Sequence, residues 1–195
     1  LFLYFIFSPF GLWGLSVFYA LINACGFWFI YKTARVKLNF KNPKSLALSM
    51  SGASYALLFF IPIAAYIVQP RTQALTFVGL ALLYYIFSLP LVKLRRKLWL
   101  IPLIFILWVN LHGGFILGLG FLGLLSLLRV WEAGSSALEF SEQKQLIVSL
   151  GLVNLISAAA TLLNPYGWRA YSLALQIATN KYNMQYNLDW SPLFS

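Results

Sequence analysis

Apolar stretches long enough to cross a membrane alternate with short polar segments along most of the chain. The uncharged stretches cover residues 11–31, 46–68, 74–92 and 146–163. About 20 apolar residues suffice for a helix to cross the hydrocarbon layer, so each stretch predicts one transmembrane helix. A shorter segment, 168–179, combines tryptophan and tyrosine with Arg169 and predicts a helix at the membrane interface. Residues 129–145 carry several charges and predict a solvated loop.

Residues 98–128 form the longest apolar run, and one polar stretch, 110–114, interrupts it. A single helix of this length would rise about 46 Å, which is too long for one span with ordinary tilt. Two full spans would need about 40 residues, which is more than the run contains. We therefore predict a helical hairpin, with helices over 98–109 and 115–130 that break at the polar stretch. Such breaks are tolerated at membrane depth only where they are buried in protein or line a cavity.

The composition agrees with an all-α, polytopic transmembrane bundle. Hydrophobic residues make up 61% of the chain and charged residues only 9%, which is unlike a soluble domain. The pattern predicts about five or six membrane helices, two of them forming the broken hairpin. We interpret residues 1–195 as a single integral-membrane domain. The chain starts at Leu1 and stops at Ser195 without natural-looking ends, so we expect it to be truncated at the N-terminus and also at the C-terminus.

The net charge of +10 comes from clusters of Lys and Arg beside the apolar stretches. These clusters lie at 32–44, at 93–97 and around Arg129 and Lys144. Loops rich in cations face the cytoplasm, so these segments are expected on that side. Nucleic acid is not an expected partner, because no basic face is suited to follow a phosphate backbone.

With this topology, four unusual polar clusters fall on the non-cytoplasmic face. They are Arg71, Asn110–Gly114, Asn164–Gly167 and Asp189-Trp190. Their shared face predicts one shared site. The prediction depends on the hairpin at 98–130, since a single span there would move the last two clusters to the other side.

Two interpretations are open for each of these polar positions. His112 is either a buried imidazole bonded to a helix carbonyl, or a ligand contact or proton-transfer group in a polar cavity. Arg71 either extends along the interface to water or binds phosphate. Asp189 either caps a loop, or has a functional role as a metal ligand or a general base. Asn164–Gly167 is a helix stop, beside which Tyr166 could also line the site.

Neither a metal site nor a nucleotide site is predicted. His112 is the only histidine, and its loop offers no thiolate or carboxylate for zinc. Asp189 alone does not support a divalent-cation site, which usually takes several oxygen ligands. Gly118–Gly123 matches GxGxxG but lies in an apolar helix rather than after a strand. Gly114 and Gly118 also form a GxxxG motif, which is typical of helix packing. The lone Cys25 can form no internal disulfide.

Four motifs carry a resemblance to a known family. They are Gln69-Pro70-Arg71-x-Gln73, Leu107-Trp108-Val109-Asn110-Leu111-His112-Gly113-Gly114-Phe115, Leu163-Asn164-Pro165-Tyr166-Gly167 and Asp189-Trp190-x-Pro192. Over about residues 69–192, the chain resembles a family of largely uncharacterised bacterial polytopic membrane proteins. Those proteins are in turn similar to the GT-C glycosyltransferases, which include protein mannosyltransferases and lipid A aminoarabinose transferases.

The resemblance implies transfer of a sugar from a polyprenyl-phosphate donor at the periplasmic face of the bacterial inner membrane. Arg71 would bind the phosphate, and Asp189, where the family more often has Glu, would be the catalytic carboxylate. The other substrate-binding positions would be Asn110, His112, Asn164, Tyr166 and Trp190. The acid that GT-C enzymes usually carry in their first external loop would lie upstream of Leu1.

The resemblance implies membrane lipids and a lipid-linked sugar as partners, and no cofactor in this segment. The alternative is a transporter or assembly subunit that handles lipid-linked or polysaccharide substrates without catalysis. Transporters often contain paired repeats with broken helices in both halves. The sequence predicts one broken helix, at 110–114, and this favours the enzyme.

Overall fold

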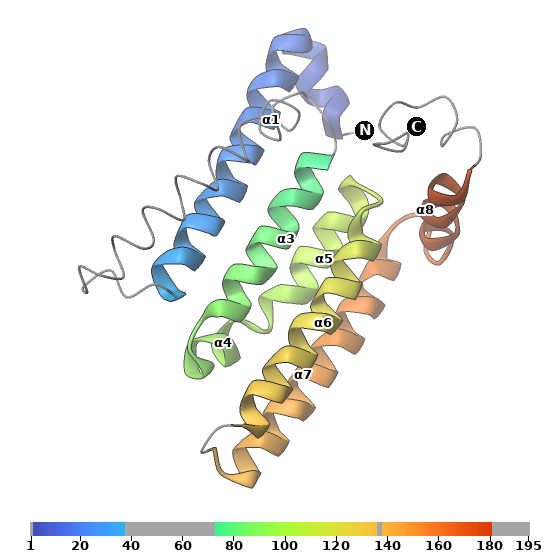
Figure 1. Cartoon of the computed structure of the whole chain (residues 1–195). Helices are drawn as coiled ribbons and strands as arrows, with labels where there is room; N and C mark the ends of the chain where they lie inside the picture. The colour runs from blue at the N-terminus through green and yellow to red at the C-terminus, as the bar shows by residue number, and fades with distance from the viewer. Residues whose placement is uncertain (1, 38–72, 136–137, 181–195) are drawn as a thin grey trace, which may run out of the picture.

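The computed structural model describes residues 2–37, 73–135 and 138–180, and all regular structure in these ranges is helical. The helices are α1 (Phe2–Lys37), α3 (Gln73–Ser88), α4 (Leu91–Lys97), α5 (Leu100–Leu111), α6 (Phe115–Gly134), α7 (Phe140–Ala160), η1 (Thr161–Leu163) and α8 (Arg169–Thr179). The five longest run side by side, with α3 packed between α1 and the α5–α6 pair, and α7 against α5 and α6 (Figure 1). The all-α prediction is confirmed.

Three of the described helical segments are long and apolar enough to cross a membrane. They are Leu3–Lys37, Phe115–Gly134 and Phe140–Leu163. Two further apolar helices are shorter, Gln73–Ser88 and Leu100–Leu111. The predicted span over 46–68 lies outside the described residues.

The predicted break in the longest apolar run is present. Helix α5 ends at Leu111, and α6 begins at Phe115. Between them His112 has extended backbone angles (φ −159°, ψ 140°), which cannot continue a helix. The 12 residues of α5 correspond to a rise of about 18 Å, so α5 is shorter than a full span.

The predicted solvated loop over 129–145 is wrong. Helix α6 continues to Gly134, and α7 already begins at Phe140. The charge of Arg129 does not end the helix, because its guanidinium is bonded to Glu132 one turn later and to carbonyls of the neighbouring α3. A charged residue whose hydrogen bonds are satisfied can therefore remain within a helix.

Two other predicted boundaries change. The span predicted over 74–92 ends at Ser88, because Pro90 disfavours helical angles at the residue before it. At the N-terminus, Ser8-Pro9-Phe10-Gly11 is typical of a turn, and this predicts that the first span begins at Gly11 and that the residues before it lie outside the helix. They are helical, and α1 kinks at Gly11, whose φ of 58° favours glycine.

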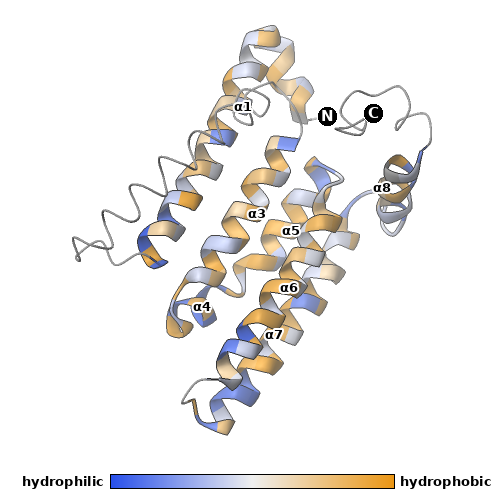
Figure 2. Ribbon diagram, in the orientation of Figure 1, coloured by the Kyte–Doolittle hydropathy of each residue, from blue (hydrophilic) through white to orange (hydrophobic). Residues whose placement is uncertain are grey.

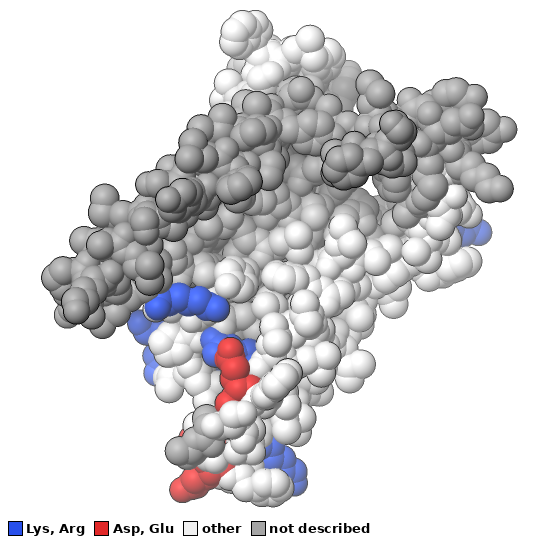
Figure 3. All heavy atoms as spheres, viewed as in Figure 1, with Lys and Arg blue, Asp and Glu red and all other residues white. Residues whose placement is uncertain are grey.

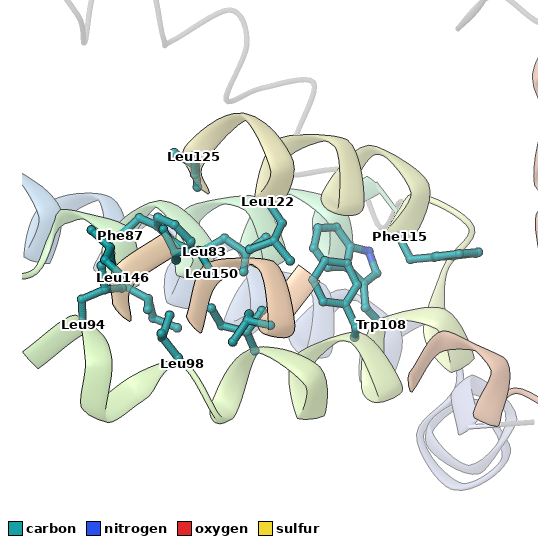
Figure 4. Close-up of a cluster of buried hydrophobic side chains, with 14 of the residues drawn as sticks. Leu83, Phe87, Leu94, Leu98, Trp108, Phe115, Leu122, Leu125, Leu146 and Leu150 are labelled. Atoms are coloured by element: carbon teal, nitrogen blue, oxygen red, sulfur yellow. The ribbon is translucent and has the colours of Figure 1, made fainter. Parts of the chain in front are cut away.

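The described bundle is apolar both inside and outside. Leu83, Leu122 and Leu150 come from α3, α6 and α7 and meet in one buried cluster (Figure 4). Large apolar side chains on the outer surface include Leu117 at 67% exposure and Leu155 at 69%. Hydrophobic residues therefore surround the helices, with polar residues gathered toward the end at α4 (Figure 2). Helices that are hydrophobic all round suit a lipid surrounding.

Charged side chains lie almost entirely at one end of the described bundle. This cation-rich end is formed by the C-terminal ends of α1, α3 and α6, by α4, and by the start of α7 (Figures 1 and 3). The opposite end carries the α5–α6 break and α8. Arg169 is the only charged side chain that the structure describes there. We call this opposite end the hairpin end.

Candidate functional site

Two of the sequence motifs meet at the hairpin end. The side-chain Nδ2 of Asn164 donates to the main-chain oxygen of Val109 at 3.0 Å and lies 3.3 Å from Oδ1 of Asn110. Asn110 donates its own Nδ2 to the carbonyl of Ile106 at 2.8 Å, one turn back along α5. The last turn of α5 is thereby joined to the residue that follows η1. The prediction that these two clusters share one face is confirmed.

The Asn-Pro-Tyr-Gly segment is a tight turn built around Asn164. Its Oδ1 accepts a hydrogen bond from the backbone N–H of Tyr166 at 2.9 Å, as asparagine side chains commonly do in turns. Its main-chain oxygen accepts from the N–H of Gly167 at 2.8 Å. Gly167 has φ 53°, a conformation that glycine adopts readily. One asparagine therefore both shapes the turn and binds it to α5.

His112 lies at the apex of the hairpin. Its backbone N–H donates to the oxygen of Trp108 at 2.9 Å and so ends α5. The imidazole is half-buried, and burial lowers the pKa of His112 from its usual 6.5, because a charged ring would lose hydration. Within the described residues no side chain or carbonyl is hydrogen-bonded to the imidazole. The neutral ring therefore keeps one donor and one acceptor for a ligand.

Gly114 allows the apex to pack tightly against α3. A Cβ on Gly114 would overlap the Oγ1 of Thr76 and would lie 3.0 Å from Cδ2 of His112. Any side chain here would push α3 away from the hairpin. Oγ1 of Thr76 is buried and has no hydrogen-bond partner in the described part of the chain. Thr76 was not predicted; its signal in the sequence is a hydroxyl in the first turn of α3, at the hairpin end.

Helix α8 covers the other side of the apex. The rings of Phe115 and Tyr171 meet edge-to-face, with centroids 5.1 Å apart. The hydroxyl of Tyr171 is also hydrogen-bonded to Thr161 of η1. Tyr171, predicted as an aromatic residue of the membrane interface, is half-buried between the hairpin and α7. Its burial reflects the amphipathic pattern of α8, which places it on the same face as Ala174, one turn on.

Trp108 fills the space between three helices close to the apex. Its indole lies against Gly79 of α3 and Gly118 of α6, where added Cβ atoms would come within 2.6 Å and 2.5 Å of the ring. The helix-packing interpretation of the glycines is thus confirmed for Gly118, although its partner is a tryptophan ring. At Gly120 a Cβ would meet nothing within 4 Å. Nε1 of Trp108 is buried and has no hydrogen-bond partner among the described residues.

An apolar cavity of about 180 Å³ opens between α1, α3 and α5 next to this site. Leu107, Trp108 and Leu111 form its α5 wall, directly beside Asn110 and His112. The remaining lining residues are Ile22, Leu75, Val78, Gly79, Leu82 and Ile104. An apolar ligand in this cavity would have one end close to the polar groups of the hairpin.

The predicted site residues are placed as follows. Asn110, His112 and Asn164 come together at the hairpin end. Tyr166 lies in the same turn, but its side chain is 64% exposed, and only its backbone is bonded to Asn164. The other predicted residues, Arg71, Asp189 and Trp190, lie outside the described residues.

The described part of this site offers hydrogen bonds rather than charge. The amides of Asn110 and Asn164 are largely engaged in the junction itself, which leaves one N–H of Asn110 and the second lone pairs of their oxygens beside the imidazole of His112. Such neutral donors and acceptors are suited to hydroxyl groups. No group of three or more His, Cys, Asp or Glu that could hold a metal ion occurs in the described ranges. No family model, no curated protein and no solved structure matches the chain.

Proposed function

We propose that this chain is part of a membrane glycosyltransferase-like protein that moves a sugar from a polyprenyl-phosphate donor to an acceptor. The observation that carries the proposal is the hydrogen-bonded junction of Asn164 with Val109 and Asn110, beside His112. It joins two of the motifs on which the resemblance to the bacterial membrane-protein family rests. Amides and a neutral imidazole can bind sugar hydroxyls in both donor and acceptor roles.

In the proposed reaction, the acceptor hydroxyl forms a bond to the anomeric carbon of the sugar. The bond from that carbon to the phosphate oxygen breaks, and the polyprenyl phosphate leaves with the electron pair. Asp189 takes the proton of the acceptor hydroxyl, and Arg71 stabilises the charge on the leaving phosphate. His112, Asn110 and Asn164 orient the sugar, and Tyr166 and Trp190 are the remaining substrate-binding residues of the proposal.

The apolar cavity beside the hairpin supports a lipid-linked donor. The α5 residues that line it are Leu107, Trp108 and Leu111. An isoprenoid chain held there would bring its phosphate toward His112. The buried N–H of Trp108 and hydroxyl of Thr76 are further groups that a polar ligand could engage.

The proposed setting is the bacterial inner membrane, with five or six membrane helices and the hairpin end at the periplasmic face. The charge asymmetry of the bundle supports this orientation, because cation-rich ends of membrane helices face the cytoplasm. The predicted span over 46–68 and the two shorter apolar helices, α3 and α5, would add to the three long helices. The lateral exposure of residues such as Leu155 supports contact with membrane lipids.

Alanine substitutions in the full-length protein test the proposal. Arg71→Ala and His112→Ala should each lower sugar transfer at least about a hundredfold, as loss of a group that stabilises developing charge or orients substrate typically does. Arg169→Ala is the matched control, since Arg169 is an exposed cation at the hairpin end outside the four motifs. Transfer is followed by mass spectrometry of the glycosylated acceptor and of the polyprenyl-phosphate sugar.

Full transfer in both variants, at normal expression, would contradict the assigned roles. A transporter or assembly subunit would give a different result. The lipid-linked sugar would then cross the membrane at an altered rate in the variants, while its glycosidic bond stayed intact in purified protein.

A further inference from the structure

A polar crevice of about 130 Å³ lies at the cation-rich end, far from the hairpin, between α1, α3 and α6. Its polar lining consists of Lys37, Tyr84, Ser88, Arg129 and Glu132, and its apolar lining of Phe87, Leu125 and Leu128. Figure 3 shows the Lys and Arg atoms gathered toward this end of the molecule. The crevice thus combines charged and apolar walls in a small space.

Lys37 brings a positive charge over the crevice. It lies in the last turn of α1, and its Nζ is 5.1 Å from the centre of the Tyr84 ring of α3. The aromatic face attracts the ammonium group and holds it beside the crevice. Lys37 has no acidic partner among the described residues. Its charge is therefore available to an anion.

Arg129 forms the opposite wall and is already held in place. Its Nη2 donates to the oxygen of Leu89 at 2.7 Å and to that of Phe87, and its Nη1 pairs with Glu132 at 2.9 Å. These bonds leave an N–H on Nη1 and the N–H on Nε without a partner in the described part of the chain. Since Arg129 offsets the charge of Glu132, the crevice retains the positive charge of Lys37.

Neighbouring aromatic residues place this crevice at the level of lipid headgroups. Nζ of Lys32 lies 4.7 Å from the centre of the Trp28 ring, and Arg35 lies 5.9 Å from that of Tyr31. Tryptophan and tyrosine with adjacent cations mark the membrane–water interface. From the crevice, Leu128 continues outward along α6 and is 44% exposed, so an acyl chain can follow it into the hydrocarbon.

We propose that this crevice binds the phosphate of an anionic membrane lipid, with Lys37 and Arg129 as its cationic contacts and its acyl chains along Leu128. Basic pockets between membrane helices on the cytoplasmic side are suited to anionic headgroups. The proposed site rests on the membrane placement of the bundle. It is independent of sugar transfer, which concerns the other end.

Thermal unfolding of the purified full-length protein in detergent tests the site. The probes are short-chain phosphatidylglycerol, short-chain phosphatidylcholine and inorganic phosphate, each titrated separately. A ligand that binds the folded state raises the unfolding temperature, and at a given concentration a tighter ligand raises it more. Phosphatidylglycerol should stabilise the protein at concentrations where the other two do not. Lys37→Gln should weaken its apparent affinity about fivefold, as loss of one cation near a lipid surface implies.

Lys93→Gln is the matched control, because Lys93 is an exposed cation at the same end and does not line the crevice. It should leave the affinity within about twofold, and Lys37→Arg should retain it. Equal losses in Lys37→Gln and Lys93→Gln would show diffuse attraction and overturn the site. Stabilisation by phosphatidylcholine to the same extent, or by inorganic phosphate to the same extent, would overturn the assignment to an anionic lipid.

Discussion

The side-chain amide of Asn164 donates a hydrogen bond to the main-chain oxygen of Val109, 55 residues earlier in the chain, at 3.0 Å. This bond satisfies a carbonyl in the last turn of α5, which the break at His112 leaves without a partner within the helix. Asn164 at the same time forms the turn that leads into α8. The junction therefore couples the broken hairpin to the end of α7.

Replacement of Asn164 by Asp should destabilise this junction. The substitution keeps the oxygen that accepts from Tyr166 but replaces the donor with an oxygen that faces the carbonyl of Val109. We expect a loss of about 2 kcal/mol, in the range for an unsatisfied hydrogen-bonding group. The measurement is thermal or denaturant unfolding in detergent. Asn110→Asp is the comparison. It also loses a donor, but it keeps the oxygen that faces Asn164, and the carbonyl of Ile106 that its amide contacts lies one turn back within α5 rather than at the helix end, so it should cost less; equal costs would argue against the proposed role of Asn164.

Replacement of Gly118 by Ala should disturb the packing of Trp108. A Cβ at this position would lie 2.5 Å from the indole, which is enclosed on its other side by Gly79. Overpacking of this kind costs about 1–3 kcal/mol. Gly120→Ala lies in the same helix, where a Cβ meets nothing within 4 Å, and should be neutral or stabilising. Tryptophan fluorescence and unfolding of the two variants compare them directly, and similar stabilities would show that α3 or α6 adapts without cost.

Arg129 should be more important for stability than the other arginines of the cation-rich end. Its guanidinium connects α6 to the carbonyls of Phe87 and Leu89 at the end of α3. Lysine cannot span both carbonyls and Glu132, so Arg129→Lys should cost about 1–3 kcal/mol. Arg96→Lys, at an exposed position of α4, should change stability by less than about 0.5 kcal/mol. The prediction fails if the two variants unfold at the same denaturant concentration.

The stability of the protein should fall when the pH is lowered through the range in which His112 titrates. Burial lowers the pKa of His112 in the folded state below its ordinary 6.5. The unfolded chain therefore binds the proton first. The stability that the folded protein has while the ring is neutral is fully present above pH 6.5. It is lost as the pH falls from there toward the folded pKa.

His112→Gln should remove that part of the pH dependence. Because the chain contains one histidine, the difference between the unfolding curves of the two proteins isolates this group. The comparison covers about pH 7.5 to about pH 5.5, around the ordinary range of histidine titration. Parallel pH profiles would show that the ring is as well hydrated in the folded state as in the unfolded chain.

The sequence was sufficient to predict the elements that depend on composition and chain length. Apolar runs of span length predicted helices, and the length of residues 98–128 required a break near His112. Charge clusters predicted correctly that the hairpin and Asn164 lie at the same end. These features follow from the local cost of placing polar groups in an apolar surrounding, so they can be read along the chain.

The tertiary structure decided how distant residues satisfy one another. Arg129 was expected to begin a loop, but the carbonyls at the end of α3 accept its hydrogen bonds and α6 continues to Gly134. The contacts of Tyr171 with Phe115 and Thr161, which leave it half-buried, were not visible in the sequence. The hydroxyl of Thr76 at the start of α3 is visible in the sequence, but its role is not, since that role depends on the close approach of Gly114. Each outcome depends on a partner more than ten residues away or on another helix, and no local pattern contains that information.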